Sequence, residues 1–230
     1  MKNVLKRLPL LMTSALLVSA CNKTININTF DLRYAYGKIS LKSKNNIDNT
    51  VKLGREIIKA FEEKNSYKAT LYMYYYDSNS KTKPLECATK SIVYNSGKFY
   101  FDSVQTYSLV GTLLPNPIHN KYYYDGNNLY NEKGVCSEEN RCALSHLVLI
   151  NQVKPILSMH EISSADVRSG KNSKLNIVEQ YVISQNQTIR FVADNNELKY
   201  YYNKMDRNTY FEAYEFIYPE DDQGFTVPTL

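Results

Sequence analysis

Apolar positions first recur with helical spacing near residue 50. They fall on one stripe over about 49–64, and the charged residues lie mostly on the opposite side. The sequence therefore predicts an amphipathic helix there, with Asp48 or Asn49 as its N-cap. The stripe consists of Val51, Leu53, Ile57, Ile58 and Phe61.

From residue 70 the spacing changes to two, which is typical of strands with one buried face. In residues 70–76, Leu71 and Met73 share one face and tyrosines share the other. Residues 95–97 (Asn-Ser-Gly) and 125–127 (Asp-Gly-Asn) each separate two alternating runs, so both predict hairpins. Short strands joined by tight turns favour an antiparallel meander.

The alternation stops over 142–159. Leu144, Leu147 and Val148 fit a helical stripe in this stretch. Because Pro155 ends or kinks a helix, we expect two short helices, one on either side of it.

Strand-like alternation resumes after this insert and continues to residue 218, with a predicted turn at residues 194–196 (Asp-Asn-Asn). In its first run, Ile177 and Tyr181 share the apolar face, and Asn176 and Gln180 share the polar one. The order of elements is thus a helix, about five strands, a short helical insert and about five more strands. This order predicts a mainly β protein of the α+β class.

The N-terminus carries a different pattern. Lys2, Lys6 and Arg7 precede an apolar run, 8–20, which is too short to span a membrane as a helix. Such a start is typical of a secretory signal. Residues 18–21 read Val-Ser-Ala-Cys and resemble the lipobox of bacterial lipoproteins. The resemblance implies cleavage before Cys21 and diacylglycerol on its thiol; the alternative is an ordinary secretory signal.

These features divide the chain into a signal peptide (1–20), a lipid anchor and tether (21–48), a folded domain (49–218) and a flexible tail (219–230). The anchor implies a membrane partner and the extracytoplasmic face of a bacterial cell envelope. The residue after the anchor is Asn22, not the aspartate of the common inner-membrane retention signal. In an organism with two membranes we therefore expect the outer one.

The charge balance excludes one class of partner. Removing the three basic residues of the signal from the 28 in the chain leaves 25, against 23 acidic residues. Nucleic-acid binding requires a clearly basic face, so we expect no nucleic-acid partner. The 21 tyrosines fit half-buried strands and strengthen the prediction of a β-rich domain.

Three cysteines remain beside the lipidated one. Cys136 and Cys142 flank a short polar loop and would close a small ring in an oxidising compartment, while the alternative pairs Cys87 with one of them. We expect no metal site, because the three histidines show no ligand spacing relative to the cysteines. They are His119, His146 and His160.

The sequence carries no catalytic motif and indicates no cofactor. It contains no Gly-x-Ser-x-Gly elbow, no His-Glu-x-x-His pair and no glycine-rich phosphate loop. Cys142 and His146 have the spacing of a nucleophile and its base on a helix. A disulfide at Cys142 and a surface position for His146 form the simpler interpretation. We therefore expect a binding protein and no enzyme.

The layout resembles the LolA/LolB-type lipoprotein-carrier fold, which the LppX/LprG lipoproteins share. Three stretches carry the resemblance: the helix 49–64 running into the strand 67–76, the hairpin 94–101, and the Asp-Gly turn within 124–130. The resemblance covers roughly residues 49–218. It implies a strongly bent antiparallel sheet, an incomplete barrel of about ten strands, with the N-terminal helix and the short helical insert as its lid.

The resemblance also implies a half-barrel cavity for acyl chains or another hydrophobic ligand, used in envelope lipid or lipoprotein transport. A strongly bent sheet needs apolar cover on its concave face, supplied by ligand or by helix. We expect the lining to come from the apolar strand faces and the lid. The predicted lining residues are Leu71, Met73, Phe99, Phe101, Ile177, Ile189 and Phe191, with Leu147 and Val148 from the lid.

The alternative function is a surface interaction or envelope-structural lipoprotein with a filled core. Tyr72, Tyr74 and Tyr76 share the more polar strand face, and residues 200–202 add more tyrosine. Exposed tyrosines are common in recognition surfaces, so this face would contact an envelope protein or a polysaccharide.

Overall fold

The computed structural model describes residues 47–75, 85–108, 111–137, 142–155, 167–172, 175–182, 187–205 and 210–230. The predicted signal, the predicted lipidation site Cys21 and most of the predicted tether lie outside the described residues. The same holds for the second short helix expected after Pro155, and for Tyr76. Among the described residues, no helix is long and apolar enough to cross a membrane.

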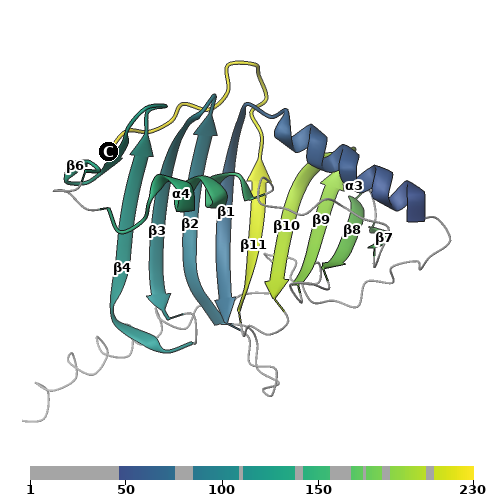
Figure 1. Ribbon diagram of the computed structural model, residues 1–230, viewed down its shortest axis with the longest axis horizontal. Coiled ribbons are helices and arrows are strands. Elements are labelled where there is room, and N and C mark those ends of the chain that lie inside the picture. Colours follow the sequence, from purple (N-terminus) through teal and green to yellow (C-terminus); the bar gives the residue numbers. More distant parts are fainter. Residues whose placement is uncertain are drawn as a thin grey trace, which may run out of the picture.

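Eleven strands of the described chain form a single antiparallel sheet, with two helices on one of its faces (Figure 1). The sheet is not closed into a barrel, which confirms the predicted mainly β, incomplete-barrel class. The helices are α3 (Ile47–Glu62) and α4 (His146–Val153). The strands are β1 (Ser66–Tyr75), β2 (Leu85–Asn95), β3 (Lys98–Tyr107), β4 (Leu113–Tyr124), β5 (Leu129–Asn131), β6 (Gly134–Val135), β7 (Val167–Asn172), β8 (Leu175–Val182), β9 (Gln187–Asp194), β10 (Glu197–Met205) and β11 (Tyr210–Ile217).

Two meanders make up this sheet, in the order β6-β5-β4-β3-β2-β1-β11-β10-β9-β8-β7. Each meander pairs strands that follow one another in the chain. They join where β1 pairs with β11, with Leu71 opposite Tyr214. The first and last strands of the domain therefore lie side by side at the centre of the sheet.

Tight turns connect the strands where the sequence predicts them. Ser96 and Gly97 have φ values of 49° and 87°, and Asn195 and Asn196 have 47° and 67°. Two consecutive residues with positive φ form the turn whose twist matches that of paired antiparallel strands, and Gly and Asn adopt it at low cost. The hairpin predicted at 95–97 is thus confirmed.

Helix α3 lies along β7–β10, whereas α4 crosses the other half of the sheet (Figure 1). The N-cap prediction was wrong, because α3 begins at Ile47 and places Asp48 inside its first turn. There the carboxylate faces the positive end of the helix dipole. The most buried positions of α3 follow helical spacing and are Thr50, Gly54, Ile57 and Phe61.

The two faces of the sheet are called here the helix face, which α3 and α4 cover, and the outer face. The main core lies between the helix face and the helices. A second buried cluster lies on the outer face, over the central strands. It consists of Tyr74, Ile177, Val192, Tyr202, Phe211 and Ala213.

The pairing between β9 and β10 is irregular, so residues of β10 do not alternate strictly between the two faces. The register between β9 and β10 shifts between Leu198 and Tyr200. A β-bulge inserts an extra residue, so the side chains beyond it change faces. Leu198 packs in the main core, whereas Tyr200 and Tyr202 belong to the outer-face cluster.

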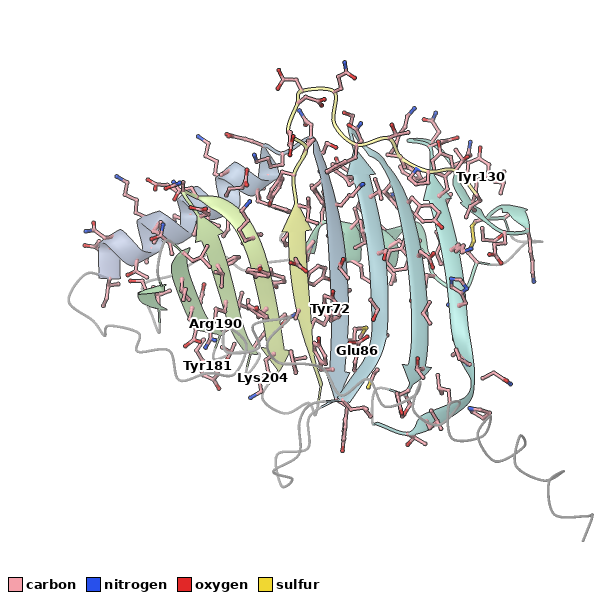
Figure 2. All side chains as sticks on the ribbon, turned by 180° about the vertical axis from the view of Figure 1, so that it is seen from behind. Tyr72, Glu86, Tyr130, Tyr181, Arg190 and Lys204 are labelled. Carbon is pink, nitrogen blue, oxygen red and sulfur yellow. A yellow bond between two sulfur atoms is a disulfide. The ribbon has the colours of Figure 1, made fainter. Side chains whose placement is uncertain are left out.

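The outer face also holds a buried ion pair. Arg190 donates to Glu179 Oε2 from Nε at 2.9 Å and from Nη2. The two residues lie opposite each other on β9 and β8. Figure 2 shows Arg190 on this part of the outer face. Burial on both faces makes this half of the sheet an internal layer of the fold.

The C-terminal segment packs on the sheet, although the sequence predicted a flexible tail from Pro219. The Asn95 side chain donates to the Phe225 carbonyl at 2.9 Å, and Phe225 N donates to Ser66 Oγ at 2.8 Å. The Lys68 ammonium lies 4.5 Å from the centre of the Phe225 ring. These contacts hold the segment as it crosses the sheet toward β6 (Figure 1).

Candidate functional site

The helix face carries an aromatic and aliphatic floor that the sequence located largely correctly. Six of the nine predicted lining residues lie on it, all buried and in one cluster. They are Leu71, Met73, Phe99, Phe101, Ile189 and Phe191. Leu149 and Val153 of α4 pack down onto this floor.

Three predicted lining residues lie elsewhere. Ile177 is opposite Val192 in the outer-face cluster, so it points away from the helices. Leu147 and Val148 are 72% and 43% exposed. Because α4 begins only at His146, its sheet-facing positions are Leu149 and Val153, four residues apart on one side of the helix.

A band of polar side chains crosses the apolar floor. Glu212, Asn203 and Gln180 lie on the helix face at the same level as Met73 and Ile189, as the strand registers show. Lys90 lies one level away, opposite Leu71. Lys90 and Gln180 are both more than nine-tenths buried.

Only part of this polar band is satisfied by hydrogen bonds within the described residues. The Lys90 ammonium donates to Gln152 Oε1 of α4 at 2.8 Å. The Gln187 amide donates to Asn203 Oδ1 at 2.6 Å. Gln180 Oε1 is buried and has no hydrogen-bond partner among the described residues. A buried acceptor without a partner costs about 1–3 kcal/mol, so a ligand donor at this point would be favoured.

Burial shifts the titration of the charged members of the band. It raises the pKa of Glu212 above the usual glutamate value, against the lowering effects of the Lys90 charge and a hydrogen bond with Asn203. Burial lowers the pKa of Lys90, while the charge of Glu212 acts in the opposite direction. Burial therefore disfavours the charged forms of both Glu212 and Lys90. A polar ligand bonded to these groups could reduce that cost.

A Glu212→Gln variant should change how stability depends on pH. Since the pKa of Glu212 is raised in the folded state, the stability it contributes is complete below the unfolded pKa and is lost as pH rises through the folded pKa. Between about pH 4 and pH 7, the free energy of unfolding of the variant should therefore rise relative to wild type. Urea unfolding at several pH values measures this, and a constant difference would contradict it.

Besides the apolar packing of Leu149 and Val153, polar contacts at both ends of α4 attach it to the sheet. The Tyr67 hydroxyl donates to the Val153 carbonyl at 2.7 Å, and Leu144 N donates to the Tyr122 hydroxyl at 3.2 Å. Ser145 caps the helix, since its hydroxyl accepts from Val148 N at 3.4 Å. These bonds position the apolar side of α4 over Phe99 and Phe101.

A disulfide joins Cys136, just after β6, to Cys142, just before α4. This is the first of the two pairings that the sequence predicted. Cys87, which the alternative pairing would have used, is a buried free thiol at the β1–β2 bulge. The disulfide ties the start of α4 to the edge of the sheet. It also removes Cys142 as a nucleophile.

Serine at both Cys136 and Cys142 should lower the free energy of unfolding by about 2 kcal/mol, because the bond closes a loop of only six residues. Chemical denaturation with and without reductant measures the effect. A Cys87→Ala variant is the control and should keep the full response to reductant. An equal response to reductant in the double serine variant would contradict the assignment.

His146 is half-buried against the sheet, although the sequence favoured a surface position. Its ring stacks on Phe99 at 6.1 Å and contacts Tyr124 at 4.4 Å between ring centres. The imidazole therefore serves as part of the aromatic floor. Within the part of the chain that the structure describes, no cluster of His, Cys, Asp or Glu could hold a metal ion.

Sequence reasoning missed the polar band. Gln180 and Asn176 were placed on the solvent side of β8, yet register puts both on the helix face. The one available signal was Lys90, a charged residue between alternating apolar positions of β2. No protein-family model matches this chain, and no curated protein shows significant sequence similarity to it.

Proposed function

We propose that this protein is an envelope-anchored lipoprotein that binds an amphiphilic ligand between α4 and the helix face of the sheet. The observation that carries the proposal is the arrangement of α4. Its inner side chains, Leu149 and Val153, are fully buried on an aromatic floor, whereas Leu147 and Val148 on its outer side are exposed. A short helix that is apolar on both sides is suited to separate from one apolar partner and meet another.

The floor suits acyl chains. Phe99, Phe101 and Phe191 are completely buried under the helices, so chains that enter would replace contacts with α4 by contacts of the same kind. For α4 to move, its hydrogen bonds to the sheet would have to break, and the ligand would have to replace the apolar contacts of Leu149 and Val153. The Tyr67–Val153 hydrogen bond is the central one.

The polar band suits the other end of an amphiphile. Lys90 offers an ammonium group, and Gln180 Oε1 offers a buried acceptor that has no partner among the described residues. Few polar groups in an apolar site fix the orientation of a ligand. We infer that a polar head group lies at the band, with its chains along the phenylalanines.

Anchoring at Cys21 supports a role in the envelope. The lipobox-like residues 18–21 motivate it, and the position of Asn22 is consistent with an outer membrane where one exists. Stable anchoring requires more than one acyl chain, which a lipid-modified cysteine provides. Replacement of Cys21 by alanine should abolish incorporation of labelled fatty acid.

The test is mass spectrometry of organic extracts from an unlipidated form that begins at Asn22, secreted through a cleavable signal. Recovery of about one equivalent of lipid per chain supports the proposal and identifies the ligand class. A clean extract from a folded protein that also takes up no lipid from vesicles would overturn it. Ala88→Phe on the helix face should reduce loading, while Val104→Phe, exposed on the outer face, should not.

A further inference from the structure

A groove lies on the outer face over β3–β6, on the side of the sheet away from the helices. Tyr100, Tyr123 and Tyr130 stand next to one another across three strands, because Tyr123 is opposite both of the others. They line an open groove of about 580 Å³ together with Lys121, Glu132 and other residues. Ligand sites typically measure about 300–1,000 Å³. Figure 2 shows Tyr130 at this end of the outer face.

Carboxylates hold two of the three rings in place. The Tyr130 hydroxyl donates to Asp125 Oδ2 at 3.0 Å, and the Tyr100 hydroxyl donates to Asp102 Oδ2 at 3.4 Å. Asp125 is itself fixed, since its Oδ1 accepts backbone bonds from Asn127 and Asn128 at 2.7 Å each. The rings of Tyr123 and Tyr130 lie 5.8 Å apart and 30° from parallel. The groove therefore presents a preformed aromatic surface.

The charges around the groove disfavour an anionic ligand. Lys121 lies 3.8 Å from Glu132, and His119 Nε2 lies 2.7 Å from Asp102 Oδ1. With Asp125 beside Tyr130, a phosphate or an acidic chain would meet more carboxylates than ammonium groups. The electrostatics thus favour a neutral ligand.

The lining is aromatic and polar with little aliphatic surface. Leu230 is the one aliphatic side chain among the described residues that line the groove, whereas Lys121, Asn131 and Glu132 bring donors and acceptors. An acyl chain would leave these polar groups without partners. A ring with polar edges and apolar faces can lie on a tyrosine and bond to the polar groups beside it.

We propose that this groove binds a neutral oligosaccharide, with sugar rings on Tyr123 and Tyr130 and hydroxyls bonded to Lys121 and Glu132. This site is independent of the lipid site, because its residues lie on the opposite face of the sheet. One face would bind an amphiphile and the other a glycan. Tyr72, Tyr74, Tyr200 and Tyr202, the recognition residues of the alternative function, do not contribute to it.

The test is a glycan array of neutral oligosaccharides followed by titration calorimetry with the oligosaccharide that binds best, on the mature chain. Tyr123→Ala should weaken binding at least tenfold, and Tyr123→Phe should keep it within about threefold, because the ring remains. Tyr181→Ala is the matched control at the other end of the outer face and should leave binding unchanged (Figure 2). Glu132→Gln changes an exposed side chain and should also weaken binding without affecting the fold.

Three outcomes would overturn the proposal. The first is the absence of binding to every neutral oligosaccharide at millimolar concentration by the folded protein. The second is binding that Tyr123→Ala and Glu132→Gln leave unchanged. The third is capture of proline-rich peptides by the same tyrosines without glycan binding, since such peptides also dock on aromatic grooves. An empty lipid site would leave this proposal standing, so the two proposals can fail separately.

Discussion

Replacement of Tyr67 by alanine is expected to lower the free energy of unfolding by about 3–5 kcal/mol. Tyr67 is 1% exposed at the centre of the helix face. Its ring packs against Phe61 of α3 at 5.2 Å, Tyr94 of β2 at 5.0 Å and Phe216 of β11 at 5.8 Å. Its hydroxyl donates to the Val153 carbonyl at the end of α4.

Tyr67 is therefore the one side chain among these that contacts both helices and both meanders. Removing its ring opens a cavity between the two helices and the two meanders, which the surrounding sheet cannot fill by collapsing. Tyr67→Phe keeps the ring and removes only the bond to Val153, so it should cost about 1 kcal/mol. Chemical denaturation of the two variants separates packing from hydrogen bonding.

A small loss for Tyr67→Ala, below about 1 kcal/mol, would contradict the central packing of this ring. Tyr67→Phe also bears on the proposed function. If α4 moves to admit ligand, the weaker attachment of Val153 should speed lipid uptake from vesicles. Unchanged uptake by a folded Tyr67→Phe protein would argue that this hydrogen bond does not limit entry.

Leu149→Ala is expected to lower the free energy of unfolding by about 2–5 kcal/mol, whereas Leu147→Ala should change it by less than about 0.5 kcal/mol. The two leucines lie two positions apart on α4. Leu149 is fully buried on the aromatic floor, and Leu147 is 72% exposed. The same chemical change thus removes packed contacts at one site and exposed surface at the other.

This pair of variants tests the placement of α4 directly. Thermal and urea unfolding measure both under the same conditions, and helix propensity contributes little because both changes replace leucine by alanine. Equal losses for the two variants would mean that α4 does not present Leu149 to the sheet. A larger loss of unfolding free energy for Leu147→Ala would instead support Leu147 as a lining residue, as the sequence predicted.

The floor of the candidate site could be predicted because residues of one strand alternate strictly. Leu71 and Met73 share a face of β1 whatever the position of that strand in the sheet, and Phe99 and Phe101 share a face of β3 in the same way. The same reasoning failed for Ile177, because alternation groups residues without saying which group meets the helices. Both faces of β8 are buried, so hydrophobicity does not distinguish them.

The polar band and the tyrosine groove are assembled from strands distant in sequence. Lys90 and Glu212 come near each other because β2 pairs with β1 and β1 pairs with β11. Leu230 lines the same groove as Tyr130 only because the C-terminal segment crosses the sheet. No pattern within a short stretch of the sequence indicates that these residues become neighbours in the fold. The bulge at β10 adds a further difficulty, since one extra residue reverses the faces of Tyr200 and Tyr202.

By itself, the sequence determined the local elements: the helix after residue 47, the alternating strands, the tight turns at Gly97 and Asn195, and the mainly β class. These depend on spacing and backbone preference within a few residues. Tertiary structure alone decided the pairing of β1 with β11, the burial of both faces of β8 and the side of α4 that meets the sheet. Those features depend on contacts between distant segments, whose free energy comes from packing that local sequence does not encode.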